Sequence, residues 1–170
     1  KNYAGFILLS SFFVLGVLTT NYIVYIFKKD VIDKVQASKL LFSGSPFDFD
    51  MVWKTVSYYS SFFLMLPALL LVILMSNEFT YKTHRQNIID GWSRFEFLKV
   101  KLAMALVFAL GSTVVIILTG LIFGVTSGSS FSLNGFENIG YFCLKALTYN
   151  MVAILISLLV RRSGVAIALF

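Results

Sequence analysis

Charge is scarce in this sequence. Only 13% of the 170 residues are charged, whereas 58% are hydrophobic. An average soluble domain is about 25% charged and about 45–50% apolar, and a domain of this length cannot enclose so much apolar surface. The composition excludes a soluble enzyme domain and a disordered tail, and it predicts a chain that has the lipid bilayer as its main partner.

Residue types that build catalytic and metal sites are also rare. The chain has one cysteine, Cys143, and one histidine, His84. A single cysteine cannot form an internal disulfide, which excludes a disulfide scaffold. One histidine cannot form a usual zinc site or a Ser–His–Asp set without suitable residues nearby. We therefore expect no catalytic residues and no metal site, although the paired acids of the 28–54 segment leave a cation site open as a less favoured alternative.

A phosphate-binding loop is missing as well. The sequence has no Gly-x-x-x-x-Gly-Lys-Ser/Thr run, which is the pattern that cradles ATP phosphates. We expect no cofactor to bind this chain. The net charge of +6 is not typical of a nucleic-acid partner here, because the basic residues lie between apolar runs and form no stripe.

Long apolar runs are what the sequence has in abundance. A helix needs about 20 residues to cross a bilayer, and four runs satisfy this condition: 3–27, 55–76, 102–124 and 139–160. Their continuity favours helices over the alternating pattern of a strand barrel. The predicted fold is an all-α transmembrane helix bundle, a single domain over residues 1–170. A fifth run begins near residue 164, so we expect this chain to be part of a longer protein.

The basic residues predict the orientation of the bundle, because cytoplasmic loops are enriched in Lys and Arg. The side with the N-terminus and the 77–101 loop carries 8 basic residues, and the opposite side carries 5. We therefore place the first side in the cytoplasm. Lys145 lies within the fourth span, where a charge is costly; it is either a functional residue or a lysine whose stem reaches the membrane surface.

Glycine and proline mark two features of the spans. Gly120, Gly124 and Gly128 follow one another at four-residue spacing, which leaves a flat stripe for close helix approach. The stripe serves either packing within the bundle or a subunit interface. Pro67 removes a backbone hydrogen bond from the second span and is expected to kink it.

The outer segments differ in character. Residues 31–42 have a roughly helical apolar spacing that predicts a short helix in the membrane interface. Phe47, Phe49 and Trp53 follow, and we expect them to form an aromatic cluster at the membrane edge. The second outer loop, 125–138, is rich in Ser and Gly and is predicted to be a flexible link.

The 77–101 loop contains the signals of a short helix. Thr83 with Gln86 and Ser93 with Glu96 fit capping boxes, and Gly91 between them favours a stop. The prediction is a helix over 84–90, a turn at Gly91, and a new helix that runs into the third span. So short a helix is unstable alone in water, so it must rest on the membrane or on a partner protein.

This loop resembles that of ATP-binding-cassette permeases of the ABC-2 export type, and more closely the branch found in Bacteroidota. In that family a Glu ends the second span, and Thr-x-Arg, a short helix, Ser-Arg-x-x-Phe and a Lys follow. The matching positions here are Glu78, Thr83, Arg85, Ser93, Arg94, Phe97 and Lys101.

The resemblance implies a function for the whole chain. It implies a six-span permease subunit in the bacterial inner membrane that pairs with a second copy or a homologue. ATP and Mg would bind a separate cytoplasmic ATPase subunit. The short helix would be the coupling helix that docks on this ATPase, with Glu78 and Arg94 bracing it. We expect Glu78 to pair with Arg85 or Arg94. The implied coupling positions are Thr83, His84, Arg85, Gln86, Asn87, Ile88, Ile89 and Asp90.

Two other functions stay open. The first is a membrane anchor in a complex that uses ATPase strokes for mechanical work or assembly and moves no substrate. It shares the coupling loop, but an exporter also needs a cavity or a lateral opening. The second is an ATP-independent carrier or channel, which predicts polar groups that face one another at mid-membrane; spans one to three have few such groups beyond serine and threonine.

Overall fold

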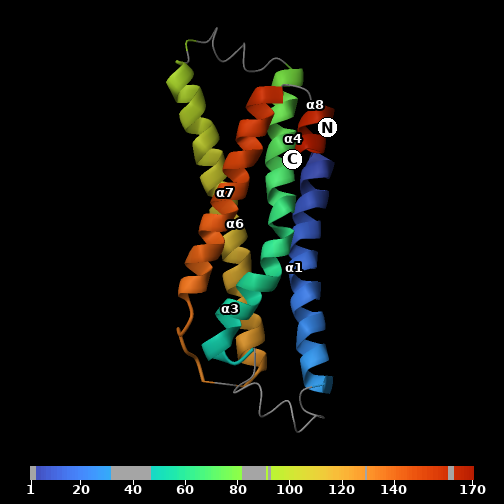
Figure 1. Ribbon diagram of the computed structural model, residues 1–170, viewed down its shortest axis with the longest axis vertical. Coiled ribbons are helices and arrows are strands. Elements are labelled where there is room, and N and C mark those ends of the chain that lie inside the picture. Colours follow the sequence, from blue (N-terminus) through green and yellow to red (C-terminus); the bar gives the residue numbers. More distant parts are fainter. Residues whose placement is uncertain (1–2, 32–46, 82–90, 92, 129, 161–162) are drawn as a thin grey trace.

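The protein is an all-helical bundle in the part of the chain that the structure describes. The computed structural model describes residues 3–31, 47–81, 91, 93–128, 130–160 and 163–170 (Figure 1). Its elements are α1 (Tyr3–Val31), α3 (Phe49–Ser60), the 3₁₀ helix η1 (Ser61–Leu64), α4 (Met65–Thr80), α6 (Arg94–Thr126), α7 (Glu137–Val160) and α8 (Ser163–Leu169).

Four helical segments are long and apolar enough to cross a membrane: Ala4–Phe27, Phe49–Thr80, Phe95–Thr126 and Glu137–Val160. The chain is therefore a multi-pass membrane protein, and the predicted fold class is confirmed. The helices extend beyond the predicted spans. The apolar run decides where lipid surrounds the helix, whereas its backbone hydrogen bonds continue until a cap or a turn ends them.

The second crossing changes its helical form near Pro67. Residues Ser61–Leu64 form a 3₁₀ turn between α3 and α4, directly before the turn that contains Pro67. Pro67 has no N–H to donate to the carbonyl one turn earlier, at Phe63. The Ser61 hydroxyl also donates to the Ser57 carbonyl over 3.0 Å. This side chain competes with backbone N–H groups for a helical carbonyl. Figure 1 shows that α3 leaves the line of α4, as the proline predicts.

The aromatic residues predicted at the membrane edge lie inside the bundle. Phe47 and Trp53 have 0% and 1% of their surfaces exposed. The Phe47 ring lies 5.5 Å from that of Phe123 on α6 and 5.6 Å from that of Tyr25 on α1. The predicted aromatic cluster is present, since the Phe49 and Trp53 rings lie 6.3 Å apart, but these rings pack on other helices and not on lipid.

The second outer loop is tied to α3, so the predicted flexible link is wrong for its described residues. The Trp53 indole N–H donates to the Ser132 carbonyl over 3.1 Å, and the Asn134 amide donates to the Asp50 carboxylate over 3.0 Å. The Phe136 ring lies 5.3 Å from that of Trp53. Polar loop residues gain fixed positions when a neighbouring helix supplies partners, and composition alone does not reveal those partners.

The helix ends alternate between the two ends of the bundle. The start of α1, the end of α4, the start of α6 and α8 lie at one end, and the described part of the second outer loop lies at the other (Figure 1). Successive crossings therefore run in opposite directions, as the predicted orientation requires. Val31 is the last residue of α1, and the rest of the predicted interface helix over 31–42 lies outside the described residues.

Candidate functional site

A buried ion pair joins the second and third crossings at the end of the bundle where α4 ends and α6 begins. The Lys101 ammonium on α6 donates to both carboxylate oxygens of Glu78 on α4. The Lys101 side chain is 4% exposed and that of Glu78 is 28% exposed. The ammonium also lies 4.8 Å from the centre of the Phe97 ring, a favourable cation–π position. The pair fixes the two helices that flank residues 82–90.

The start of α6 is capped as predicted. The Ser93 side chain accepts from the Glu96 backbone N–H over 3.2 Å, and the Ser93 backbone N–H donates to the Glu96 carboxylate over 2.8 Å. These reciprocal bonds satisfy backbone donors that the first turn leaves free. Gly91 has a φ of +93°, so the predicted turn at this glycine is confirmed. The connection therefore enters α6 through a defined turn and cap.

Glu78 has a partner that was not predicted, Lys101. The expected pairing of Glu78 with Arg85 or Arg94 stays a prediction. Arg94 opens α6, and its side chain lies outside the described part. The predicted helix over 84–90 also lies outside the described residues, together with Thr83, His84, Arg85, Gln86, Asn87, Ile88, Ile89 and Asp90.

The glycine stripe divides into two parts. A Cβ at Gly120 would lie 2.9 Å from the Trp53 ring, and one at Gly124 would lie 2.6 Å from the Phe49 ring. Both glycines therefore give the aromatic side chains of α3 room against α6 within one chain. Gly128 lies beyond the end of α6 with a φ of +73°, and a Cβ at this position would have no neighbouring atom within 4 Å. It serves the turn after the helix and is not part of the packed stripe.

An apolar hollow opens between α1, α4 and α6. We call it the lateral hollow; it has a volume of about 270 Å³ and is lined by residues such as Phe6, Phe13, Pro67, Phe108 and Gly111. The Ser10 and Ser112 side chains also line it, but the Ser112 hydroxyl donates to the Phe108 carbonyl of its own helix. Its chemistry therefore suits an apolar occupant.

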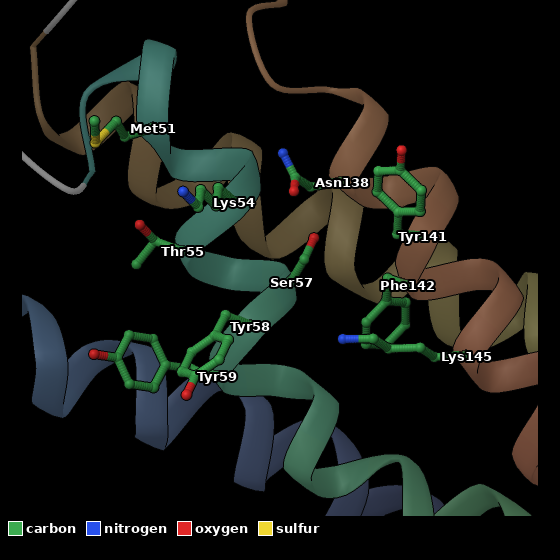
Figure 2. A pocket seen from close by; sticks show the side chains of 10 residues that line it. All are labelled: Met51, Lys54, Thr55, Ser57, Tyr58, Tyr59, Asn138, Tyr141, Phe142 and Lys145. Atoms are coloured by element: carbon green, nitrogen blue, oxygen red, sulfur yellow. The ribbon is translucent and has the colours of Figure 1, made fainter.

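A second hollow lies between α3 and α7 and is polar. We call it the polar hollow; its volume is about 350 Å³. Lys54, Ser57 and Tyr58 line it from α3, and Asn138, Tyr141 and Lys145 line it from α7 (Figure 2). Lys145 was a candidate from the sequence, but its grouping with these residues was not predicted. The sequence assigns Lys54 and the start of the fourth span to the same side of the membrane. This was the signal that could have indicated that these residues lie together.

Two buried asparagines were also missed. The Asn21 amide on α1 donates to the Ser60 hydroxyl on α3 over 3.1 Å, and the Asn150 amide on α7 donates to the Ala105 carbonyl on α6 over 3.0 Å. Each bond joins two crossings, as polar residues commonly do between membrane helices. Asn21 and Ser60 do face each other inside the bundle, which is the kind of contact that the carrier alternative requires.

The remaining candidate ligands are His84 and Cys143. His84 lies outside the described residues, and Cys143 is a half-buried free thiol on α7. In the described ranges, no group of three His, Cys, Asp or Glu side chains is positioned to hold a metal ion.

Comparison with known proteins finds no relative of this chain. No protein-family model, no curated protein and no solved structure matches the chain.

Proposed function

We propose that this chain is a permease subunit of an ATP-driven exporter in a bacterial inner membrane, and that it docks a separate ATPase through residues 83–90. The ATPase binds ATP and Mg, and a second copy or a homologue of this chain completes the transport path. The proposal starts from the sequence of the 77–101 loop and its resemblance to ABC-2 permeases.

The observation that carries the proposal is that the helices on both sides of the proposed coupling segment are held in place. Glu78 and Lys101 hold the end of α4 against α6, and the Ser93–Glu96 box fixes the start of α6. A lever that receives a push must be anchored at both ends, because a frayed helix end absorbs displacement and does not transmit it. A joint of this kind between two membrane crossings fits force transfer.

The lateral hollow favours an exporter over an anchor without transport. An exporter needs an opening between helices that a substrate can enter, and the hollow of about 270 Å³ lies between α1, α4 and α6. Its lining is mostly apolar, so it suits a hydrophobic substrate or the apolar part of an amphiphile. A static anchor has no need of this space, and close packing would stabilise it more.

Charge reversal at Arg85 tests the docking. Affinity-tagged protein purified from its native membranes should bring down an ATPase that carries a phosphate-binding loop, and Arg85→Glu should abolish this copurification while the bundle stays folded. The matched control is Lys39→Glu, the same reversal on the opposite side of the membrane, which should leave copurification unchanged. Equal recovery of the ATPase with Arg85→Glu would contradict the proposed contact, and absence of any ATPase from the wild-type preparation would favour the ATP-independent carrier.

A further inference from the structure

The polar hollow combines two unpaired cations with hydrogen-bonding groups. Lys54 and Lys145 line it from different helices, and its lining includes no carboxylate. Within the described residues, neither lysine takes part in an ion pair. The nearest acid along α3 is Asp50, and its carboxylate accepts from Asn134 of the outer loop. An anion in the hollow would be attracted to both ammonium groups.

A buried hydroxyl without a partner points into the same space. Ser57 is 7% exposed, and its side-chain oxygen has no hydrogen-bond partner. Buried hydroxyls are normally paired, because an unpaired one costs free energy. Figure 2 shows this hydroxyl directed from α3 toward α7, across the space that Lys145 and Asn138 also line. A ligand oxygen in the hollow would supply the missing partner.

The position of the hollow favours a lipid over a soluble anion. Lys145 is eight residues into α7, roughly 12 Å along the helix from its first residue. Because α7 is about 36 Å long and the hydrocarbon core is about 30 Å thick, Lys145 lies inside the edge of the core, and its stem can carry the ammonium to the head groups. The rim is apolar and aromatic: Met51, Tyr58 and Tyr141 are 47%, 60% and 61% exposed. Such side chains are typical of a surface that contacts the head-group region of a bilayer.

Space for an acyl chain continues along α7. An adjoining hollow of about 500 Å³ shares Asn138, Tyr141 and Lys145 with the polar hollow and extends past Leu144 to Tyr149. A ligand that places its anionic end between the lysines can therefore lay an apolar tail along the exposed face of α7.

We propose that the polar hollow binds the anionic head group of a phospholipid, with Lys54 and Lys145 as the cationic contacts and Ser57 as a hydrogen-bond donor. This inference does not depend on the proposed coupling to an ATPase, because the hollow lies at the opposite end of α3 and α4 from Glu78. Failure of either proposal leaves the other intact.

Calorimetric titration of the purified full chain in a neutral detergent tests the site. The probes are short-chain phosphatidylglycerol, short-chain phosphatidylcholine and glycerol phosphate. Phosphatidylglycerol should bind at least about tenfold more tightly than phosphatidylcholine, since charge-assisted hydrogen bonds add a factor of this order. The Lys54→Gln and Lys145→Gln double variant should lose this preference.

Three controls make the result decisive. Lys99→Gln removes an exposed lysine at the other end of the bundle and should bind like wild type, and Lys145→Arg keeps the charge and should retain the preference. Lys145→Gln alone alters only an exposed side chain and should weaken binding even if the double variant does not fold. Equal affinity of the wild type for the two lipids would overturn the proposal. Unchanged binding by the double variant and by Lys145→Gln alone would also overturn it. Binding of glycerol phosphate as tight as that of phosphatidylglycerol would overturn the assignment to a lipid.

Discussion

At the residue scale, glycines of one helix have different surroundings. A Cβ at Gly120 would meet the Trp53 ring at 2.9 Å, whereas a Cβ at Gly111 would have no neighbour within 4 Å. Both lie in the interior of α6, where glycine is less favourable than alanine by about 1 kcal/mol. The sequence alone places both on the third span and cannot tell which one another side chain requires to be small.

Alanine at these two positions should therefore act in opposite directions. Gly111→Ala should stabilise the folded chain by about 0.5–1 kcal/mol, because helix propensity improves and no atom has to move. Gly120→Ala should destabilise it by about 1–3 kcal/mol, because Trp53 has to shift in a closely packed core. Thermal unfolding in detergent measures both. Equal unfolding temperatures for the two variants would show that α3 does not rest on Gly120.

At the scale of elements, the sequence predicted helix starts better than helix partners. The Ser93–Glu96 cap and the turn at Gly91 could be predicted from the sequence because each depends on residues that are close together in the chain. The pairing of Glu78 with Lys101 was not readable, because the two residues are 23 positions apart and several basic residues compete as partners. The contacts between the second outer loop and α3 were not predicted for the same reason, because Trp53 and Ser132 are 79 positions apart.

The joint between α4 and α6 should depend on its ion pair. Lys101→Met should destabilise the chain by about 2 kcal/mol, less than the range for a fully buried pair because Glu78 is 28% exposed. The double variant Glu78→Gln with Lys101→Met should recover part of this loss, because it also removes the carboxylate charge that Lys101 balances. Unfolding of the four proteins of this cycle gives the coupling between the two residues, and additive effects would contradict a direct pair.

At the scale of the whole molecule, apolar run length was enough to predict four crossings and their alternation. It was not enough to predict the bend in the second crossing in detail or the two hollows, which arise where helices diverge. The polar hollow brings together residues 54 and 145, and the lateral hollow brings together residues 6 and 111. Such groupings depend on helix rotation and tilt, which a hydropathy pattern does not specify.

Filling the lateral hollow should separate export from anchoring. Gly111→Phe introduces a ring at a residue that lines this space of about 270 Å³, and a Cβ at this glycine would have no neighbour within 4 Å. If the hollow admits substrate, the variant should keep the ATPase bound but lower its substrate-stimulated hydrolysis several-fold. Gly5→Phe, at another glycine of the bundle with open space around it, is the control. Hydrolysis equal to that of wild type would favour the anchor.

The most direct measurement is photo-cross-linking from position 84 in living cells. With a photoreactive residue in place of His84, we expect a covalent adduct to a cytoplasmic ATPase, identified by mass spectrometry through its phosphate-binding loop. The same residue at position 39, on the opposite side of the membrane, should give no such adduct. Labelling of position 84 by a reagent that cannot enter the cell would contradict the proposed docking, as would the absence of any ATPase adduct.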